Sequence, residues 1–163
     1  MKPKSFTTKV GHSNKKWLGE ILRLPYQKDN NGIDLTDDSI GVELKSRYTA
    51  HSHRFPVHCY QIDQFKKENP GKELFWAFML YGSKRPPKMI KRNIDDSITE
   101  RTVWFYEWDW IRQFPVHDVK TGPYVYVPGS FDIRDHSCFG KTDGILYAPK
   151  NSIIEKRLKS VST

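Results

Sequence analysis

Apolar and polar residues alternate from Ile40 to Lys45, and this period of two is typical of a β-strand with one face against a core. Ile40, Val42 and Leu44 share one face of that strand. Glu43 and Lys45 share the other face. The pattern therefore predicts a strand whose polar face is free for chemistry.

A hairpin is predicted just before this strand. Residues 32–39 read as a short strand followed by Thr-Asp-Asp-Ser, which are turn-forming residues. A turn of two or four residues places Asp34 opposite Gly41 and on the face of Glu43, whereas a turn of three residues reverses that face. In the first register Asp34 and Glu43 are diagonal cross-strand neighbours, about 7 Å apart at the backbone. One divalent ion would then touch both carboxylates.

The rest of the pattern predicts an α/β fold with a mixed central sheet flanked by helices. The segment 73–81 is apolar on both faces, so we expect it to be a central, buried strand. The other expected elements are helices at 13–24, 57–68 and 150–160, a short helical piece at 109–114, strands at 101–108 and 124–128, and loops at 49–56 and 83–92.

Length and composition indicate one folded domain. The chain has 163 residues, of which 37% are hydrophobic, and it carries five Trp, eight Tyr and nine Phe. Lys and Arg number 27 against 19 Asp and Glu, a formal net charge of +8. Such an excess favours a polyanionic partner, with nucleic acid first, although solubility alone would also explain it.

The sequence also bears on location. Two cysteines do not make a disulfide framework, and no apolar run approaches the ~20 residues of a membrane span. The first residues, Met-Lys-Pro-Lys-Ser, lack the apolar core of a secretory signal. We therefore expect a cytoplasmic protein with no membrane partner and no organic cofactor.

Two carboxylates and a lysine on one strand face suit phosphodiester chemistry. Asp34 and Glu43 supply the hard oxygen ligands that Mg²⁺ prefers, with Mn²⁺ as a possible substitute. Lys45 would lie beside a metal-activated water, orienting it and offsetting negative charge in the transition state.

This arrangement resembles the signature of the PD-(D/E)xK nuclease superfamily, an acidic residue followed by Glu-x-Lys. Here it is Asp34 followed by Glu43-Leu44-Lys45, with Ile33 where the superfamily name has proline. The run Gly-Val-Glu-Leu-Lys-Ser is similar to the corresponding strand of small type II restriction endonucleases and mismatch-repair nicking enzymes. The resemblance covers about residues 14–82.

The resemblance implies a restriction-endonuclease-like core at about residues 14–82. The sequence shows no helix-turn-helix or zinc-finger module, so we expect the DNA-recognition and dimerisation elements at about residues 83–163. The resemblance also implies that a glutamate of the first helix, here Glu20, assists metal binding; an ordinary surface glutamate is the alternative. Polar residues of the helix after the Glu-x-Lys strand, here Gln61 and Gln64, would face the site.

Further candidates for DNA contact are basic residues and histidines. Arg47 shares the face of Glu43, and the five cations of the loop at 83–92 surround a Pro-Pro pair; a merely solvated loop is the alternative. For His51 and His53, plain surface histidines are the alternative. Together with the two glutamines, the complete set of DNA-contact candidates is Arg47, His51, His53, Gln61, Gln64, Lys84, Arg85, Lys88, Lys91 and Arg92.

Zinc is a separate hypothesis for the histidine-rich stretch. His51, His53, His58 and Cys59 match no closed Cys/His spacing, and only Cys138 with His136 would complete a site from far away in the sequence.

The sequence therefore predicts a Mg²⁺-dependent endonuclease that cuts double-stranded DNA as a homodimer, of the restriction or homing type. A Holliday-junction resolvase or other structure-specific nuclease of the same superfamily is one alternative. An RNA-processing nuclease and a non-enzymatic nucleic-acid-binding protein are the others.

Overall fold

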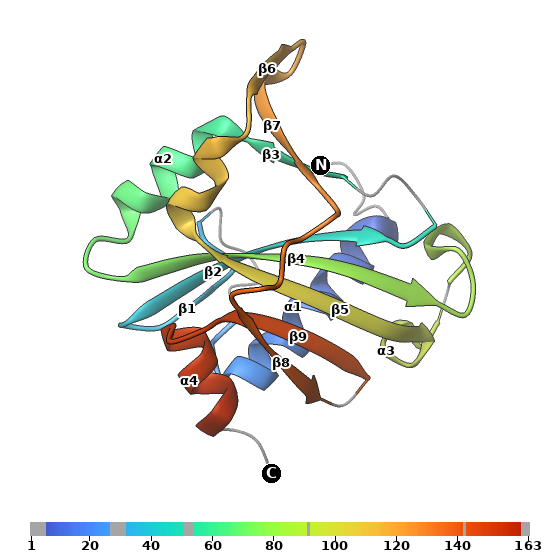
Figure 1. Cartoon of the computed structure of the whole chain (residues 1–163). Coiled ribbons are helices and arrows are strands. Elements are labelled where there is room, and N and C mark those ends of the chain that lie inside the picture. The colour runs from blue at the N-terminus through green and yellow to red at the C-terminus, as the bar shows by residue number, and fades with distance from the viewer. Residues whose placement is uncertain (1–5, 27–31, 51–53, 91, 142, 161–163) are drawn as a thin grey trace.

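A six-stranded mixed sheet forms the centre of the structure (Figure 1), a computed structural model that describes residues 6–26, 32–50, 54–90, 92–141 and 143–160. Neighbouring pairs β2–β4 and β5–β9 are parallel, and the other neighbours are antiparallel. The fold is thus mixed α/β, as predicted. In spatial order the strands are β1 (Leu35–Thr36), β2 (Ile40–Tyr48), β4 (Glu73–Ser83), β5 (Ile98–Glu107), β9 (Gly144–Pro149) and β8 (His136–Lys141).

Strand β4 is central, between β2 and β5, which confirms the prediction for 73–81. Residues from Leu74 to Met79 are all buried, because layers of the protein cover both faces of the sheet. The strand continues two residues beyond the predicted end.

Helices cover one face of the sheet. Helices α1 (Phe6–Leu22) and α4 (Ile153–Ser160) pack their apolar residues against the Ile40, Val42 and Leu44 face of β2. The predicted start of the first helix at residue 13 is wrong, because α1 already begins at Phe6. Asn14 lies inside the helix, where its Oδ1 accepts a hydrogen bond from Arg101 Nε at 2.9 Å.

The other face is covered by helix α2 (Cys59–Glu68), the short helix η2 (Trp108–Gln113) and a second sheet. That sheet has the order β3 (Arg54–His58), β7 (Gly122–Pro128) and β6 (Val116–Val119). An aromatic core fills the space between the layers, and in it Trp76 stacks on Trp108 with ring centroids 3.9 Å apart. The second sheet stands away from the first in Figure 1, and its β6–β7 hairpin projects at the top.

The second sheet corrects two predictions. Residues 54–56 belong to β3 rather than to the end of a loop, because Phe55 and Val57 alternate into the aromatic core. The predicted helix at 57–68 therefore starts only at Cys59, where the His58 side chain accepts a hydrogen bond from the Tyr60 N–H.

Residues 83–163 contribute strands to both sheets, since β6 and β7 belong to the second sheet. Strands β5, β8 and β9 come from this half, and β8 and β9 were not predicted. The loop after β4 contains η1 (Pro87–Met89) and α3 (Ile94–Ser97), which lie beside α1. Within the described residues, no helix combines the length and apolar character needed to cross a bilayer.

Candidate active site

Asp34 and Glu43 lie opposite each other at the edge of the main sheet. The register pairs Leu35 with Val42 and Thr36 with Gly41, and continuing it by one residue places Asp34 across from Glu43. The predicted pairing of Asp34 with Gly41 is therefore wrong, although the predicted shared face holds.

The turn explains the shift in register. Thr36 stays in the strand, and the turn occupies residues 37–39 rather than 36–39, with β2 beginning at Ile40. The Asp37 side chain closes this turn by accepting hydrogen bonds from the N–H groups of Ser39, at 2.8 Å, and Ile40, at 3.0 Å.

Backbone hydrogen bonds fix both carboxylates. The Asp34 N–H donates to Glu43 Oε1 at 3.1 Å, and the Leu44 N–H donates to Asp34 Oδ2 at 2.9 Å. The side chains are mostly buried, with 11% of Asp34 and 6% of Glu43 exposed. The pair is thus held side by side by the hairpin itself.

Lys45 completes the predicted trio. Its Nζ lies 3.3 Å from Glu43 Oε2 and donates a hydrogen bond to Gln61 Oε1 of α2 at 2.7 Å. Gln61 therefore lies at the site, as expected for a polar residue on this helix. Gln64 does not reach it, because its side chain donates to Glu68 Oε1 on the surface at 2.6 Å.

Lys15 of α1 is a site residue that sequence reasoning missed. Its Nζ lies 3.0 Å from Asp34 Oδ1. The helix can come this close because Gly19, one turn later, packs against β1; a Cβ there would lie 3.1 Å from the Leu35 side chain and 2.9 Å from the Leu24 carbonyl oxygen. Only the position of the helix against β1 reveals Lys15, so the sequence carries no local signal for it.

Glu20 is not brought to the pair. It lies on the exposed surface of α1, and within the described residues its carboxylate makes no contact with Asp34 or Glu43. Among the residues that the structure describes, no group of three or more His, Cys, Asp or Glu side chains is placed to hold a metal ion. Asp34 and Glu43 are thus the adjacent carboxylates that the described residues offer to a divalent cation.

The environment of Glu43 favours its neutral form. Burial, and then the negative charge of Asp34, raise the pKa of Glu43 to about 8, although Lys45 and Lys15 act in the opposite direction. A divalent cation between the carboxylates would offset the repulsion from Asp34, which adds to the effect of burial on this pKa. Two adjacent carboxylates fit the protein ligands that Mg²⁺ commonly takes, with water and phosphate oxygens completing its shell.

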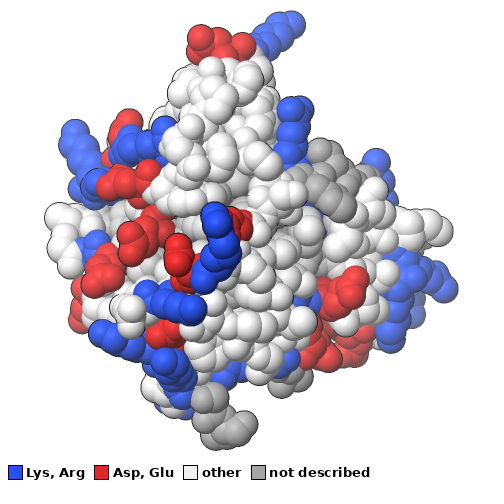
Figure 2. Space-filling view, in the orientation of Figure 1, with Lys and Arg blue, Asp and Glu red and all other residues white. Residues whose placement is uncertain are grey.

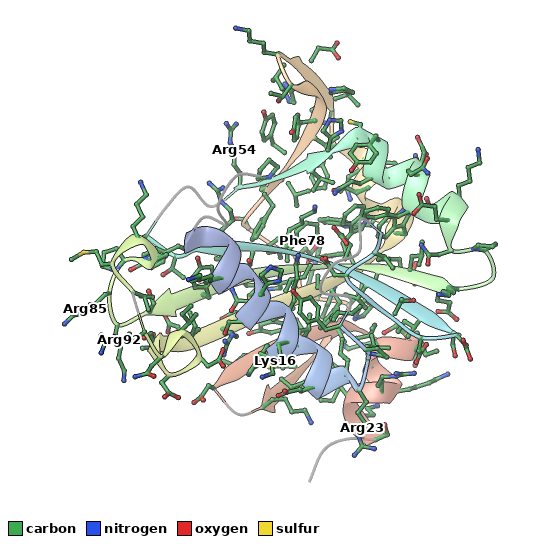
Figure 3. The ribbon with its side chains drawn as sticks, turned by 180° about the vertical axis from the view of Figure 1, so that it is seen from behind. Lys16, Arg23, Arg54, Phe78, Arg85 and Arg92 are labelled. Carbon is green, nitrogen blue, oxygen red and sulfur yellow. The ribbon has the colours of Figure 1, made fainter. Side chains whose placement is uncertain are left out.

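The predicted cations of the loop after β4 lie on the surface. Lys84, Arg85, Lys88 and Arg92 are exposed and line a hollow of about 580 Å³. Figure 2 shows blue side chains gathered over this loop, and Figure 3 shows Arg85 and Arg92 projecting from it. Lys91, His51 and His53 lie outside the described residues.

Arg47 lies farther along β2, beside a second hollow of about 360 Å³. It shares this hollow with Tyr48, Tyr81 and Lys88, so the hollow adjoins that of the basic loop. The Arg47 Nε is buried and has no hydrogen-bond partner among the described residues.

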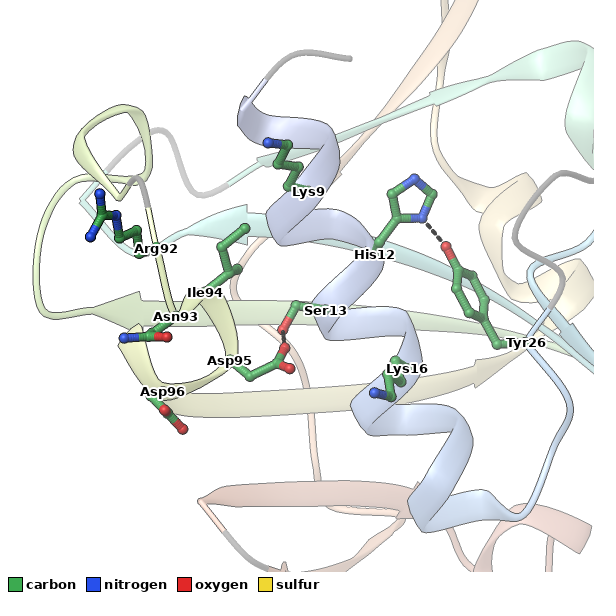
Figure 4. A pocket seen from close by; sticks show the side chains of 10 residues that line it. All are labelled: Lys9, His12, Ser13, Lys16, Tyr26, Arg92, Asn93, Ile94, Asp95 and Asp96. Atoms are coloured by element: carbon green, nitrogen blue, oxygen red, sulfur yellow. Dashed lines mark hydrogen bonds between the residues drawn. The ribbon is translucent and has the colours of Figure 1, made fainter.

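A third hollow, of about 630 Å³, lies between α1 and α3 (Figure 4). Arg92 lines both this hollow and that of the basic loop, so the two adjoin at this residue. On its walls His12 is hydrogen-bonded to Tyr26, and Ser13 to Asp95. Lys9 and Lys16 add positive charge, whereas Asp95 and Asp96 offset it.

The structure gives other roles to the residues of the zinc hypothesis that it describes. His58 caps α2, and Cys59 begins that helix with a half-buried side chain. Cys138 is exposed on β8, and His136 Nε2 is hydrogen-bonded to the Phe105 carbonyl oxygen at 2.8 Å.

Comparison with known proteins gives no family assignment. No protein-family model, curated protein or solved structure matches this chain. An assignment of function therefore depends on the geometry of the residues themselves.

Proposed function

We propose that this protein is a Mg²⁺-dependent endodeoxyribonuclease of the PD-(D/E)xK type, acting on double-stranded DNA. The observation that carries the proposal is the adjacency of Asp34, which precedes β1, and Glu43 of β2, with Lys45 Nζ 3.3 Å from the Glu43 carboxylate. Two metal-ligating carboxylates and an ammonium group are the chemical components needed to hydrolyse a phosphodiester bond.

The order of elements supports this proposal. Helix α1, the β1–β2 hairpin, helix α2 and strand β4 follow one another, and β4 is parallel to β2. The superfamily resemblance implies this order of helix, hairpin, helix and central strand. Strand β3 is an addition between the hairpin and α2, and it belongs to the second sheet.

Each residue has a distinct task in the proposed reaction. Asp34 and Glu43 hold the divalent cation, which supplies Lewis-acid activation of a water and of the phosphate. Lys45, fixed by Glu43 and Gln61, orients the attacking water and offsets charge on the phosphate. The exposed cations of the loop after β4 contact the DNA backbone.

A homodimer of restriction or homing type is part of the proposal. Each chain contributes one acid pair, and cutting both strands of a duplex needs two. A junction resolvase of the same superfamily would use the same residues, so the substrate distinguishes the two classes.

A second candidate is a nucleic-acid-binding protein without catalytic activity. The observation that favours it is that Lys15 and Lys45 already pair with the two carboxylates, and that both acids are mostly buried. In that case the acid pair and its lysines would only stabilise the hairpin.

A cleavage assay separates these functions. The wild-type protein is incubated with plasmid duplex, a synthetic four-way junction and single-stranded RNA, each with Mg²⁺ and with EDTA. We expect discrete duplex fragments in Mg²⁺ only, no cleavage by D34N or K45M, and normal cleavage by D38N, a control acid exposed in the same turn. A decrease of about 10²-fold or more in rate is expected for each site variant.

The contrary results are equally specific. Junction cleavage with an intact duplex would identify a resolvase, and RNA cleavage alone would identify an RNA nuclease. Binding of DNA without cleavage of any substrate, unchanged in D34N and K45M, would contradict the nuclease proposal and favour the second candidate.

A further inference from the structure

The outward face of the second sheet carries aromatic rings and an arginine. Strand β3 alternates exposed and buried residues, and β7 does the same, so every second residue faces away from the core. Phe55, Val57, Val125 and Val127 are the inward residues and belong to the aromatic core. We call six of the outward residues the aromatic platform: Arg54, Pro56, His58, His117, Tyr124 and Tyr126.

The strand register brings these residues into a continuous row. Tyr124 of β7 lies between His58 of β3 and His117 of β6, and Tyr126 lies opposite Pro56. The His58 and Tyr124 ring centroids are 4.7 Å apart, those of His117 and Tyr126 are 5.4 Å apart, and those of the two tyrosines are 6.3 Å apart.

Two contacts fix the ends of this row. The Arg54 guanidinium lies 4.2 Å from the centre of the Tyr126 ring, a cation–π geometry. The His58 ring lies against Gly122, where a Cβ would be 2.7 Å from Nε2 and φ is +122°, so glycine is required there. Tyr60, which is 54% exposed, extends the row from His58 with ring centroids 4.6 Å apart.

The charge of the platform is positive or neutral. Strands β3, β6 and β7 are described throughout, and Asp118, their only carboxylate, is on the opposite side from His117. Arg54 is exposed, and Figure 3 shows it projecting from the second sheet, away from Phe78 on the main sheet. The platform therefore presents aromatic rings and one arginine, and strands β3, β6 and β7 place no Asp or Glu on that face.

We propose that the aromatic platform binds unpaired nucleotides of single-stranded nucleic acid, with bases stacked on its rings and on the Arg54 guanidinium. Single-strand-binding surfaces combine aromatic side chains with positive charge in this way, because every base has a flat π-face. An intact duplex hides those faces, so the platform would not recognise it. The proposal does not depend on nuclease activity, and the acid pair plays no part in it.

The test uses binding in EDTA, where the proposed cleavage cannot interfere. Fluorescence anisotropy follows a labelled oligothymidylate and an abasic oligonucleotide of the same length, which has the same backbone without bases. We expect the wild-type chain to bind the oligothymidylate more tightly. The Y124A/Y126A variant should bind the oligothymidylate at least about tenfold more weakly and the abasic strand equally well, because stacking alone is removed.

The Y124F/Y126F variant is the matched control, since it keeps both rings and should bind as the wild type does. Equal wild-type affinity for the two oligonucleotides, or an unchanged Y124A/Y126A variant, would overturn the proposal. An oligouridylate titrated in parallel distinguishes RNA from DNA as the preferred strand.

A measurement on the wild-type chain covers the case in which the double alanine variant does not fold. An oligonucleotide containing 5-iodouracil is photo-crosslinked to the protein and the attachment sites are mapped by mass spectrometry. Crosslinks within residues 54–60 or 122–128 support the proposal, and crosslinks confined to other segments overturn it.

Discussion

Lys15 Nζ lies 3.0 Å from Asp34 Oδ1, so an ammonium group contacts one carboxylate of the proposed metal site. The lysine and a divalent cation would compete for the same oxygen. This relationship between α1 and the residue preceding β1 makes Lys15 a test of whether Asp34 binds metal.

We expect Lys15→Met to raise the affinity for Mn²⁺ about two- to fivefold, because the competing ion pair is weak and partly exposed. Isothermal titration calorimetry measures this affinity at pH 8.5, where the Glu43 carboxyl is mostly ionised. Lys16→Met is the control, since Lys16 lines the hollow between α1 and α3. Unchanged affinity in Lys15→Met would show that Asp34 is not a ligand.

The raised pKa of Glu43, about 8, predicts how stability depends on pH without metal. The folded chain binds the Glu43 proton more tightly than the unfolded chain does. The contribution of this proton to the free energy of unfolding is therefore complete below about pH 4.5 and is lost as the pH rises through 8. Urea unfolding between pH 5 and 8.5 should show a falling free energy of unfolding, with a slope of up to about 1.4 kcal/mol per pH unit.

The Glu43→Gln variant should remove this slope, because a neutral amide does not titrate. Asp38→Asn, in the exposed turn, should keep it. A wild-type curve that is flat or rises across this pH range would contradict the assigned environment of Glu43.

Gln61 is proposed as a positioning residue that acts through Lys45. The Gln61→Leu substitution removes the hydrogen-bond acceptor that lies 2.7 Å from Lys45 Nζ. It should lower the cleavage rate about tenfold, the usual effect of losing one hydrogen bond to a charged group. The pH–rate profile should also shift, which a purely structural defect would not produce. Gln64→Leu on the same helix should behave as the wild type, and equal effects of both variants would contradict this role.

The loop after β4 should supply part of the electrostatic binding of duplex DNA. Replacing Arg85 and Arg92 with alanine should weaken binding and reduce the slope of log affinity against log salt by about 0.9 for each phosphate that is no longer neutralised. The control replaces Lys66 of α2 and Arg112 of η2, which already pair with Asp109. Equal salt slopes in the two double variants would exclude the loop as a specific DNA-binding element.

The fold class followed from local patterns that tertiary structure did not override. The apolar run at 73–81 identified the central strand, and the alternation from Ile40 to Lys45 identified β2. The second sheet was harder to predict from the sequence, since β3 is five residues long and pairs with β7, some seventy residues later. A short strand whose partner lies so far away leaves only a weak periodic signal.

In the candidate site, too, local sequence patterns predicted some features and tertiary contacts decided others. The sequence by itself determined which residues are available, because Glu43 and Lys45 must share a strand face whenever that strand forms. Tertiary structure decided the rest: the turn at Asp37 set Asp34 opposite Glu43, and the approach of α1 to β1 brought Lys15 rather than Glu20 to the pair. The physical reason is that strand periodicity is a local property, whereas turn register and helix position depend on contacts between residues distant in the chain.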